Sequence, residues 1–181
     1  IRDSSLANLN SNQVPSISQL QSIAPIWVDD FSGGLSMWVN SSVPWEYRGP
    51  STSPNNFIGS QGAYAPAQTP IQSLTNSNGF VIFDSDYYDN GGVPGAFGTG
   101  LHPANGTYMG TITSPSINFS SYPNLTLKFN SYYREYTGIA KVAFSIDGGL
   151  TYTDTIDVHP EIDVNEETNP DHVVILIIPS N

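Results

Sequence analysis

Oxygen-bearing side chains are concentrated in the stretch VIFDSDYYDNGG, which spans residues 81–92. Protein-bound Ca²⁺ takes about six to eight oxygen ligands from carboxylates, amides, backbone carbonyls and water. In an extended strand, Asp84 and Asp86 point to the same side, so both carboxylates can converge on one ion. Asp89 and Asn90 could return across a bend, where the following glycines would free backbone carbonyls. The stretch therefore predicts a calcium site formed by Asp84, Asp86, Asp89 and Asn90.

This acidic stretch also has a simpler interpretation, in which carboxylates end a strand and solvate a turn. An EF-hand is excluded, because alignment on Asp84 places Tyr88 at the third acidic position and Asp89 at the required glycine. Asp29 and Asp30 form a second acidic cluster, which is open to the same two interpretations. The densest acidic run, EIDVNEETNPDH at 161–172, is interpreted as a solvated loop or hairpin tip rather than a site.

Charge and composition exclude several function classes. The 181 residues include 5 basic and 16 acidic side chains, a formal charge of -11 at pH 7, and no cysteine. A surface of this sign repels phosphate backbones and anionic membranes, so nucleic-acid binding is not expected. The absence of cysteine excludes disulfides, zinc–thiolate sites and thiol catalysis within the chain. No apolar run approaches the roughly 20 residues that a membrane-spanning helix needs.

Catalytic motifs are not evident. The chain has neither the G-x-S-x-G nucleophile elbow nor the H-E-x-x-H metalloprotease motif. Glu46 and Glu135 lie beside aromatic residues, but nothing in their spacing brings them together as a glycosidase pair. The histidines available to a Ser-His-Asp triad are His102, His159 and His172. We therefore expect no enzyme activity within this segment.

Aromatic residues are abundant enough to form a glycan-binding surface. The candidates for such a ligand-binding patch are Trp45, Tyr47, Tyr87, Tyr88 and Tyr133. The alternative is that these rings fill the core, as large rings in β-sandwiches usually do. Adjacent tyrosines in a strand place one ring on each face, which would leave some rings outside the core.

The elements that must position these residues are strands. Period-two alternation marks antiparallel strands in NLTLKFNSYY (124–133), IAKVAFSID (139–147) and LTYTDTIDV (150–158). Their expected faces are Leu125, Leu127 and Phe129; Ala140, Val142, Phe144 and Ile146; and Tyr152, Asp154, Ile156 and Val158. The glycines of DGG at 147–149 predict a hairpin between the last two strands. With no convincing helical period, an all-β antiparallel sandwich is predicted.

The ends of the chain carry separate expectations. Residues 1–25 are polar with scattered aliphatics, and are interpreted as a linker or extended N-terminal arm before a module at 26–181. HVVILIIPSN, at 172–181, is apolar on both faces and predicts a strand buried on both sides. Such a strand is unexpected at a terminus, so we expect the natural polypeptide to continue. The first residues lack the apolar run of a signal peptide, so any signal is expected to have been removed.

Four segments in order resemble a known family: WVDDFSGGLSMW, FVIFDSDYYDN, GTITSPSINFSSYPNLTLKFNSYYR and VAFSIDGGLTY. The pattern resembles MAM-like, cleaved-adhesin and choice-of-anchor jelly-roll modules of secreted Bacteroidota surface proteins. Many of those proteins are type IX secretion substrates, including gliding-motility adhesins and extracellular proteases. The resemblance covers roughly residues 26–178.

This resemblance implies a two-sheet antiparallel jelly roll that lacks its final strands here and often holds structural Ca²⁺. It also implies a calcium role for Asp30, near the first strand. The implied function is non-catalytic adhesion, or glycan or protein binding, at the outer surface of a Gram-negative bacterium after export by the type IX machinery. The alternatives are an accessory N-terminal domain of a larger exported enzyme, such as a protease, and a structural spacer.

Overall fold

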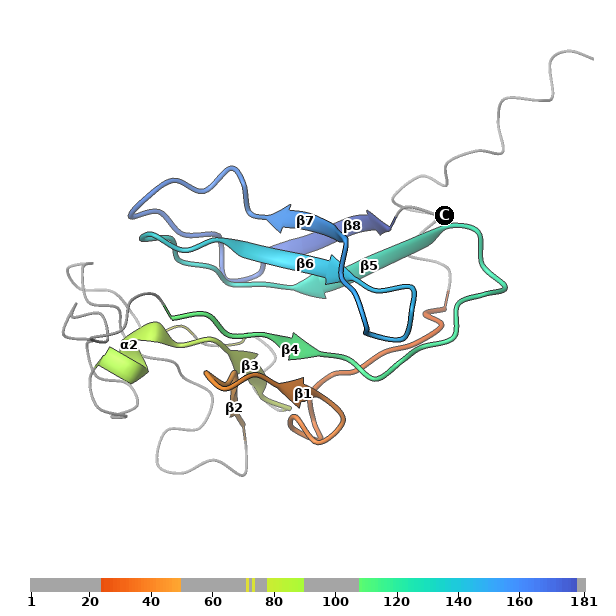
Figure 1. Ribbon diagram of the computed structural model, residues 1–181. Coiled ribbons are helices and arrows are strands. Elements are labelled where there is room, and N and C mark those ends of the chain that lie inside the picture. The colour runs from red at the N-terminus through yellow and green to blue at the C-terminus, as the bar shows by residue number, and fades with distance from the viewer. Residues whose placement is uncertain (1–23, 50–70, 72, 74–77, 90–107, 179–181) are drawn as a thin grey trace, which may run out of the picture.

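The computed structural model describes residues 24–49, 71, 73, 78–89 and 108–178 (Figure 1). Regular structure in these residues consists of strands and one short helix, α2 (Ser85–Asp89). The strands are β1 (Val39–Asn40), β2 (Glu46–Arg48), β3 (Phe80–Ile82), β4 (Ile112–Thr113), β5 (Leu125–Asn130), β6 (Ala140–Phe144), β7 (Asp154–Val158) and β8 (Val173–Ile178). None of the helical segments described is long and apolar enough to cross a membrane. The linker expected at 1–25 lies almost wholly outside the described residues.

The strands form four antiparallel pairs, β1–β4, β2–β3, β5–β8 and β6–β7. In Figure 1 the pairs β5–β8 and β6–β7 lie above the pairs β1–β4 and β2–β3, and α2 lies at one end of the lower group. The all-β prediction is therefore confirmed for the described part of the chain. The four pairs are separate two-stranded sheets, with no ladder between them among these residues.

Strand β5 follows its predicted alternation. Leu125, Leu127 and Phe129 are half-buried, whereas the residues between them are exposed. The register with β8 pairs Leu127 with Leu176 and Phe129 with Val174. Because paired residues of antiparallel strands point to the same face, these side chains share the inner face of the ribbon.

The hairpin between β6 and β7 forms around DGG, as predicted. Gly148 and Gly149 have φ of 76° and 89°, a region that glycine enters without a steric penalty. The strands are shorter than expected, because β6 ends at Phe144 and β7 begins at Asp154. The prediction that Ile146 and Tyr152 belong to these strands is wrong, because both lie outside them and their side chains are 79% and 43% exposed.

The Asp147 carboxylate explains why the strands end early. Its Oδ1 accepts hydrogen bonds from Ser145 Oγ at 2.7 Å and from the backbone N–H groups of Leu150 and Thr151 at 3.0 and 2.9 Å. Its Oδ2 accepts a fourth hydrogen bond, from Thr151 Oγ1 at 2.6 Å. These donors hold the pKa of Asp147 well below its usual range, with the Thr151 side chain the largest cause. The turn is thus organised by one side chain instead of by further ladder bonds.

Replacing this carboxylate is expected to loosen the hairpin. Asp147→Ala should lower the melting temperature at pH 7 more than Asp154→Ala, which removes an exposed carboxylate of β7. A pKa depressed by folding stabilises the fold above the unfolded-state pKa and loses that effect as the pH falls through the folded-state pKa. The difference in melting temperature between wild type and Asp147→Ala should therefore be largest at pH 7. It should shrink as the pH falls below 3.8, the ordinary pKa of an aspartate. Equal melting temperatures for the two variants at pH 7 would contradict this role.

Strand β8 differs from the expectation of a strand buried on both sides. Val174 is buried, and Leu176 and Ile178 are half-buried, but Val173, Ile175 and Ile177 on the other face are 41%, 39% and 70% exposed. The reason is that β5 supplies the only ladder partner of β8 within the described structure, and no described element covers this outer face. The sequence correctly predicted a strand here, but not its environment.

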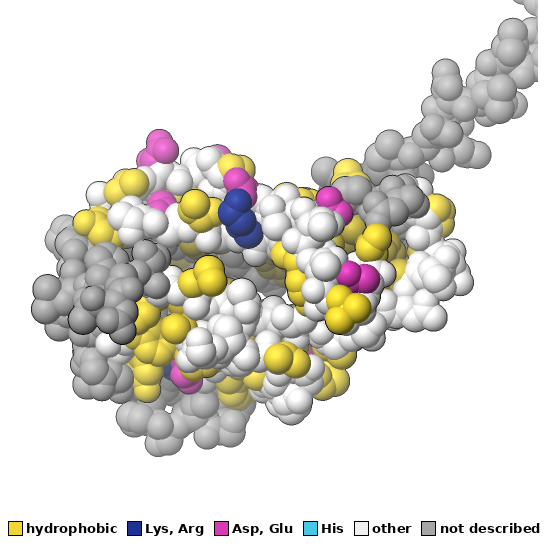
Figure 2. Space-filling model, viewed as in Figure 1, with side chains coloured by type: hydrophobic (Ala, Val, Ile, Leu, Met, Phe, Trp, Pro, Cys, Tyr) yellow, Lys and Arg dark blue, Asp and Glu magenta, His cyan; other side chains and the backbone are white. Residues whose placement is uncertain are grey.

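The apolar core is small. Among the described residues, the buried hydrophobic residues are Ile82, Val158 and Val174, and each of them keeps 7–8% of its surface exposed. Figure 2 shows hydrophobic side chains distributed over the visible face, with acidic groups between them. Val158 and Val174 come from β7 and β8, so the upper group of strands contributes most of what is buried.

Candidate functional site

The acidic stretch that predicted calcium does not continue as a strand. Strand β3 ends at Ile82, and Ser85–Asp89 form α2. The buried Asp84 side chain accepts the backbone N–H of Tyr87 at 3.1 Å, which is the N-cap interaction that starts a helix. The expected extended geometry is therefore wrong, because residues two apart do not share a face of a helix. Asp89 is the last residue of α2, but its side chain is not among the described parts of the structure. Asn90 lies outside the described residues.

The Asp29–Asp30 pair organises a turn. Asp29 Oδ1 accepts the N–H of Phe31 at 2.8 Å, and its Oδ2 accepts Trp38 Nε1 at 2.7 Å. Asp30 Oδ1 accepts the N–H of Ser32 at 2.9 Å, and this bond lowers the pKa of the exposed Asp30 carboxyl. Within the described part of the chain, neither acidic cluster supplies three ligand side chains close enough to share an ion. Calcium binding by Asp30, Asp84 and Asp86 stays a prediction.

Four of the five candidate binding rings pack in the lower group of strands. Trp45 Nε1 donates to the Gly110 carbonyl at 3.1 Å, and Tyr47 donates to the Asn78 carbonyl at 2.8 Å. Tyr88 donates to the Pro44 carbonyl, and burial raises its pKa to about 12. Tyr87 faces the Arg48 guanidinium, 5.0 Å from the ring centroid. All four rings are half-buried, so they join neighbouring segments rather than form an open platform.

Tyr133, the fifth candidate, follows β5 and belongs to a different group of side chains. Its ring stacks on the imidazole of His159, with centroids 5.2 Å apart and an interplanar angle of 15°. Its hydroxyl donates to Glu135 Oε2. Burial raises the pKa of this hydroxyl, and the Glu135 bond raises it further. This neighbourhood contains the strongest candidate site of the described residues.

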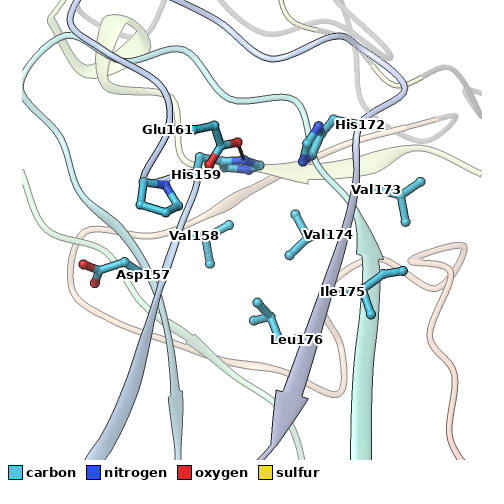
Figure 3. Close-up of a pocket in the computed structure, with 10 residues that line it drawn as sticks. Asp157, Val158, His159, Glu161, His172, Val173, Val174, Ile175 and Leu176 are labelled. Atoms are coloured by element: carbon cyan, nitrogen blue, oxygen red, sulfur yellow. Dashed lines mark ion pairs between the residues drawn. The ribbon is translucent and has the colours of Figure 1, made fainter. Parts of the chain in front are cut away.

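That site combines two imidazoles and a carboxylate. One ligand atom from each of His159, Glu161 and His172 lies within 4.8 Å of the other two. His159 Nδ1 is 3.8 Å from Glu161 Oε1, and the two histidine ring centroids are 5.0 Å apart. Figure 3 shows the three side chains converging at the end of β7 and the beginning of β8. We call this group the His–Glu–His cluster.

The backbone at His159 turns its ring into the protein. Successive strand residues face opposite sides, yet Val158 and His159 are both buried. His159 has φ of 62°, which is rare for a residue with a side chain and ends β7. The following turn is closed by the N–H of Ile162, which donates to the His159 carbonyl at 3.2 Å. Such a conformation persists only where its surroundings impose it, and it is found more often at functional sites.

The surroundings of His159 fix the direction of its ring. Ser131 Oγ lies 2.8 Å from Nε2, which leaves Nδ1 directed at Glu161. Burial lowers the pKa of His159, and the neighbouring His172 lowers it further, although Glu161 opposes both effects. The ring is therefore held neutral at neutral pH, with a lone pair available on one nitrogen.

An open pocket of ≈ 440 Å³ adjoins the cluster. Its walls come from residues 157–161, at the end of β7, and from residues 172–176, at the beginning of β8. Val158, Val174 and Leu176 make its floor apolar, and Figure 3 shows their side chains pointing into the space between the strands. The two histidines and Glu161 lie at one end of this depression, and Asp157 also lines it.

Sequence reasoning did not find this cluster. The run at 161–172 was interpreted as a solvated loop, but Glu161 and His172 at its two ends meet beside His159. The histidines were weighed only as members of a catalytic triad. A usable signal existed, because one histidine directly follows a strand and another directly precedes the next antiparallel strand. Because two antiparallel strands run in opposite directions, the residue after the first and the residue before the second lie at the same end of the structure.

Comparison with known proteins found no match, whether to a protein-family model, to a curated protein or to a solved structure.

Proposed function

We propose that this chain is a non-catalytic β module that binds a protein partner, as part of a secreted or cell-surface bacterial protein. The observation that carries the proposal is the exposed apolar row Val173, Ile175 and Ile177 on the outer face of β8. The resemblance to jelly-roll modules of exported Bacteroidota proteins supports the surface location, the type IX export route and an adhesive role. It also supports a jelly-roll arrangement of the strand pairs.

The outer face of β8 has the features of a strand-addition site. Three branched apolar side chains stand in a row, and in the register Ile175 and Ile177 lie beside Lys128 and Thr126 of β5. Figure 3 shows the side chains of Val173 and Ile175 on the opposite side of β8 from those of Val174 and Leu176. One edge of β8 pairs with β5, and the strand borders the pocket. An extended peptide can add backbone hydrogen bonds along the other edge of β8, where its own apolar side chains would lie beside the row.

A protein ligand fits this surface better than a glycan does. Sugar recognition by aromatic stacking needs exposed rings, whereas the five candidate rings are half-buried and belong to two separate groups. The polar atoms of Trp45, Tyr47 and Tyr88 already donate to backbone carbonyls. The row on β8 instead offers branched aliphatic side chains, which pack against other apolar side chains.

The alternative proposal is an accessory domain of a larger exported enzyme, such as a protease, or a structural spacer. In either case the row on β8 would be covered by a neighbouring domain of the same polypeptide. Ser131 Oγ lies 2.8 Å from His159 Nε2, and Glu161 Oε1 lies 3.8 Å from Nδ1 of the same ring. A hydroxyl beside an imidazole is the arrangement of a nucleophile with its base, so the described residues do not favour an accessory role over a catalytic one.

Binding to an array of short peptides with alternating apolar residues tests the proposal. Wild-type protein should bind a subset of these peptides, and it should not bind to a glycan array. Ile175→Lys combined with Ile177→Lys should weaken the affinity for these peptides at least about tenfold, or about 1.4 kcal/mol. Both residues are exposed, so the variant should keep the circular dichroism spectrum of the wild type.

The matched control is Ile146→Lys combined with Leu150→Lys, which adds the same charge at exposed apolar positions of the hairpin turn. This control should bind the peptides as tightly as wild type. Equal weakening by both double variants would show a general charge effect and would contradict the assignment to β8. Glycan binding without peptide binding would favour the carbohydrate function instead.

A further inference from the structure

We propose that His159, Glu161 and His172 bind a divalent transition-metal ion of the Zn²⁺ class, which fastens the end of β7 to the beginning of β8. The proposal rests on the His–Glu–His cluster and is independent of the proposed protein binding, which uses the outer face of β8.

The donor set selects the class of metal. Two imidazole nitrogens and one carboxylate oxygen are ligands typical of Zn²⁺, at bond lengths of about 2.0–2.2 Å. Ca²⁺ and Mg²⁺ prefer oxygen ligands, so this set differs in kind from the carboxylates that predicted calcium. Ligand atoms about 2.1 Å from a tetrahedral ion are roughly 3.4 Å apart. The His159 Nδ1–Glu161 Oε1 distance of 3.8 Å is near that value, and small side-chain rotations suffice to bring in His172.

The ring of His159 is already oriented for this role. Histidines that ligate a metal commonly donate a hydrogen bond from the other ring nitrogen, which fixes the tautomer and the ring direction. Ser131 Oγ occupies that position at 2.8 Å from Nε2, so Nδ1 is the ligand atom. The stacked Tyr133 ring and the φ of 62° restrict the imidazole further. These constraints come from the segment that follows β5 and from the end of β7.

The location of the cluster indicates a structural role. The two histidines flank the segment 160–171 and Glu161 lies within it. Ser131 connects His159 to the end of β5, so one ion would join three segments. The chain has no cysteine, and the described residues contain a small apolar core. Metal binding adds directly to folding stability in domains of this kind.

A hydrolytic role is less well supported by the pocket. Three protein ligands would leave a fourth position for water, and metal-bound water can act as a nucleophile when a free base is nearby. The other carboxylate that lines the pocket, Asp157, is paired with Lys141 Nζ at 2.8 Å. The described pocket thus lacks an unengaged carboxylate for that step.

Metal titration of the untagged, metal-depleted chain tests the proposal. Calorimetry should give one Zn²⁺ per chain, and saturating Zn²⁺ should raise the melting temperature by about 5 °C or more. Co²⁺ should give the visible absorption bands of a tetrahedral site with nitrogen and oxygen ligands. Glu161→Gln and His172→Ala should each weaken Zn²⁺ binding at least about tenfold and reduce the Co²⁺ bands.

Asp171→Asn is the matched control, because Asp171 is exposed and adjacent to His172 but outside the cluster. It should bind Zn²⁺ as tightly as wild type. Glu161 is also exposed, so Glu161→Gln should fold even if His172→Ala does not. Unchanged Zn²⁺ affinity in folded Glu161→Gln would overturn the proposal. It would also be overturned if Ca²⁺ raised the melting temperature and Zn²⁺ did not, a result that would favour the calcium prediction.

Discussion

Gly79→Ala is expected to destabilise the fold by about 3 kcal/mol or more, through steric overlap and backbone strain together. A Cβ at Gly79 would lie 2.6 Å from the Arg48 carbonyl oxygen and 2.8 Å from Gly49 Cα, and both of these are backbone atoms that cannot rotate away. Its φ of 88° is also unfavourable for any residue with a side chain. Because Gly79 leads directly into β3, relief of the overlap would separate β3 from β2.

Chemical denaturation at neutral pH measures this effect. The matched control is Gly33→Ala, where the new Cβ would meet only Ser36 Oγ, at 3.9 Å. The control should remain within about 0.5 kcal/mol of wild type. Similar stabilities for Gly79→Ala and Gly33→Ala would show that the close approach of Gly79 to Arg48 does not exist in solution.

Ile82→Ala is expected to cost about 2–4 kcal/mol, the second-largest effect that we predict. Ile82 is 7% exposed and is one of three buried hydrophobic residues in the described part of the chain. Removing its side chain leaves a cavity beneath β3, and with so few buried neighbours there is little apolar surface to fill it. The variant should also lose the β2–β3 pairing more readily than the other strand pairs.

Ile146→Ala is the control for this variant, since it removes the same atoms from a side chain that is 79% exposed. Denaturant melts should show a change of no more than about 0.5 kcal/mol for the control. If both substitutions cost the same, Ile82 is not part of a core, and the pairing of β2 with β3 would need another explanation.

Elements with a sustained alternation could be predicted from the sequence. Strand β5 repeats its pattern over six residues, and the hairpin after β6 is marked by two consecutive glycines. Both signals are local, because they depend on period and on turn chemistry alone. The same alternation predicts strands β6 and β7 that are too long, because it includes Ile146 and Tyr152. It does not reveal that the Asp147 carboxylate binds the backbone between these two residues.

The helix α2 could not be predicted in the same way. A five-residue helix completes little more than one turn, so no repeat of 3.6 residues can be detected in it. The deciding interaction is the cap that Asp84 provides to Tyr87. In the sequence, an aspartate that caps a helix and an aspartate that binds a metal from a strand look alike.

The His–Glu–His cluster depended on features that the sequence does not display. Glu161 and His172 meet only because the end of β7 lies beside the beginning of β8, and because the segment between these strands leads back to that place. The inward direction of His159 depends on a positive φ, which histidine adopts more often than most residues but which its residue type alone does not predict. Geometry of this kind becomes visible only once the strands are placed.

The small number of buried apolar residues in the described part of the chain has a thermodynamic consequence. The heat capacity change on unfolding comes mainly from newly hydrated apolar surface, and the denaturant m-value scales with the total surface exposed. The contribution of the described residues to both quantities should therefore be smaller than that of a densely packed segment of the same length. The curve of stability against temperature would be correspondingly flat, so cooling would weaken this fold less than it weakens a densely packed domain.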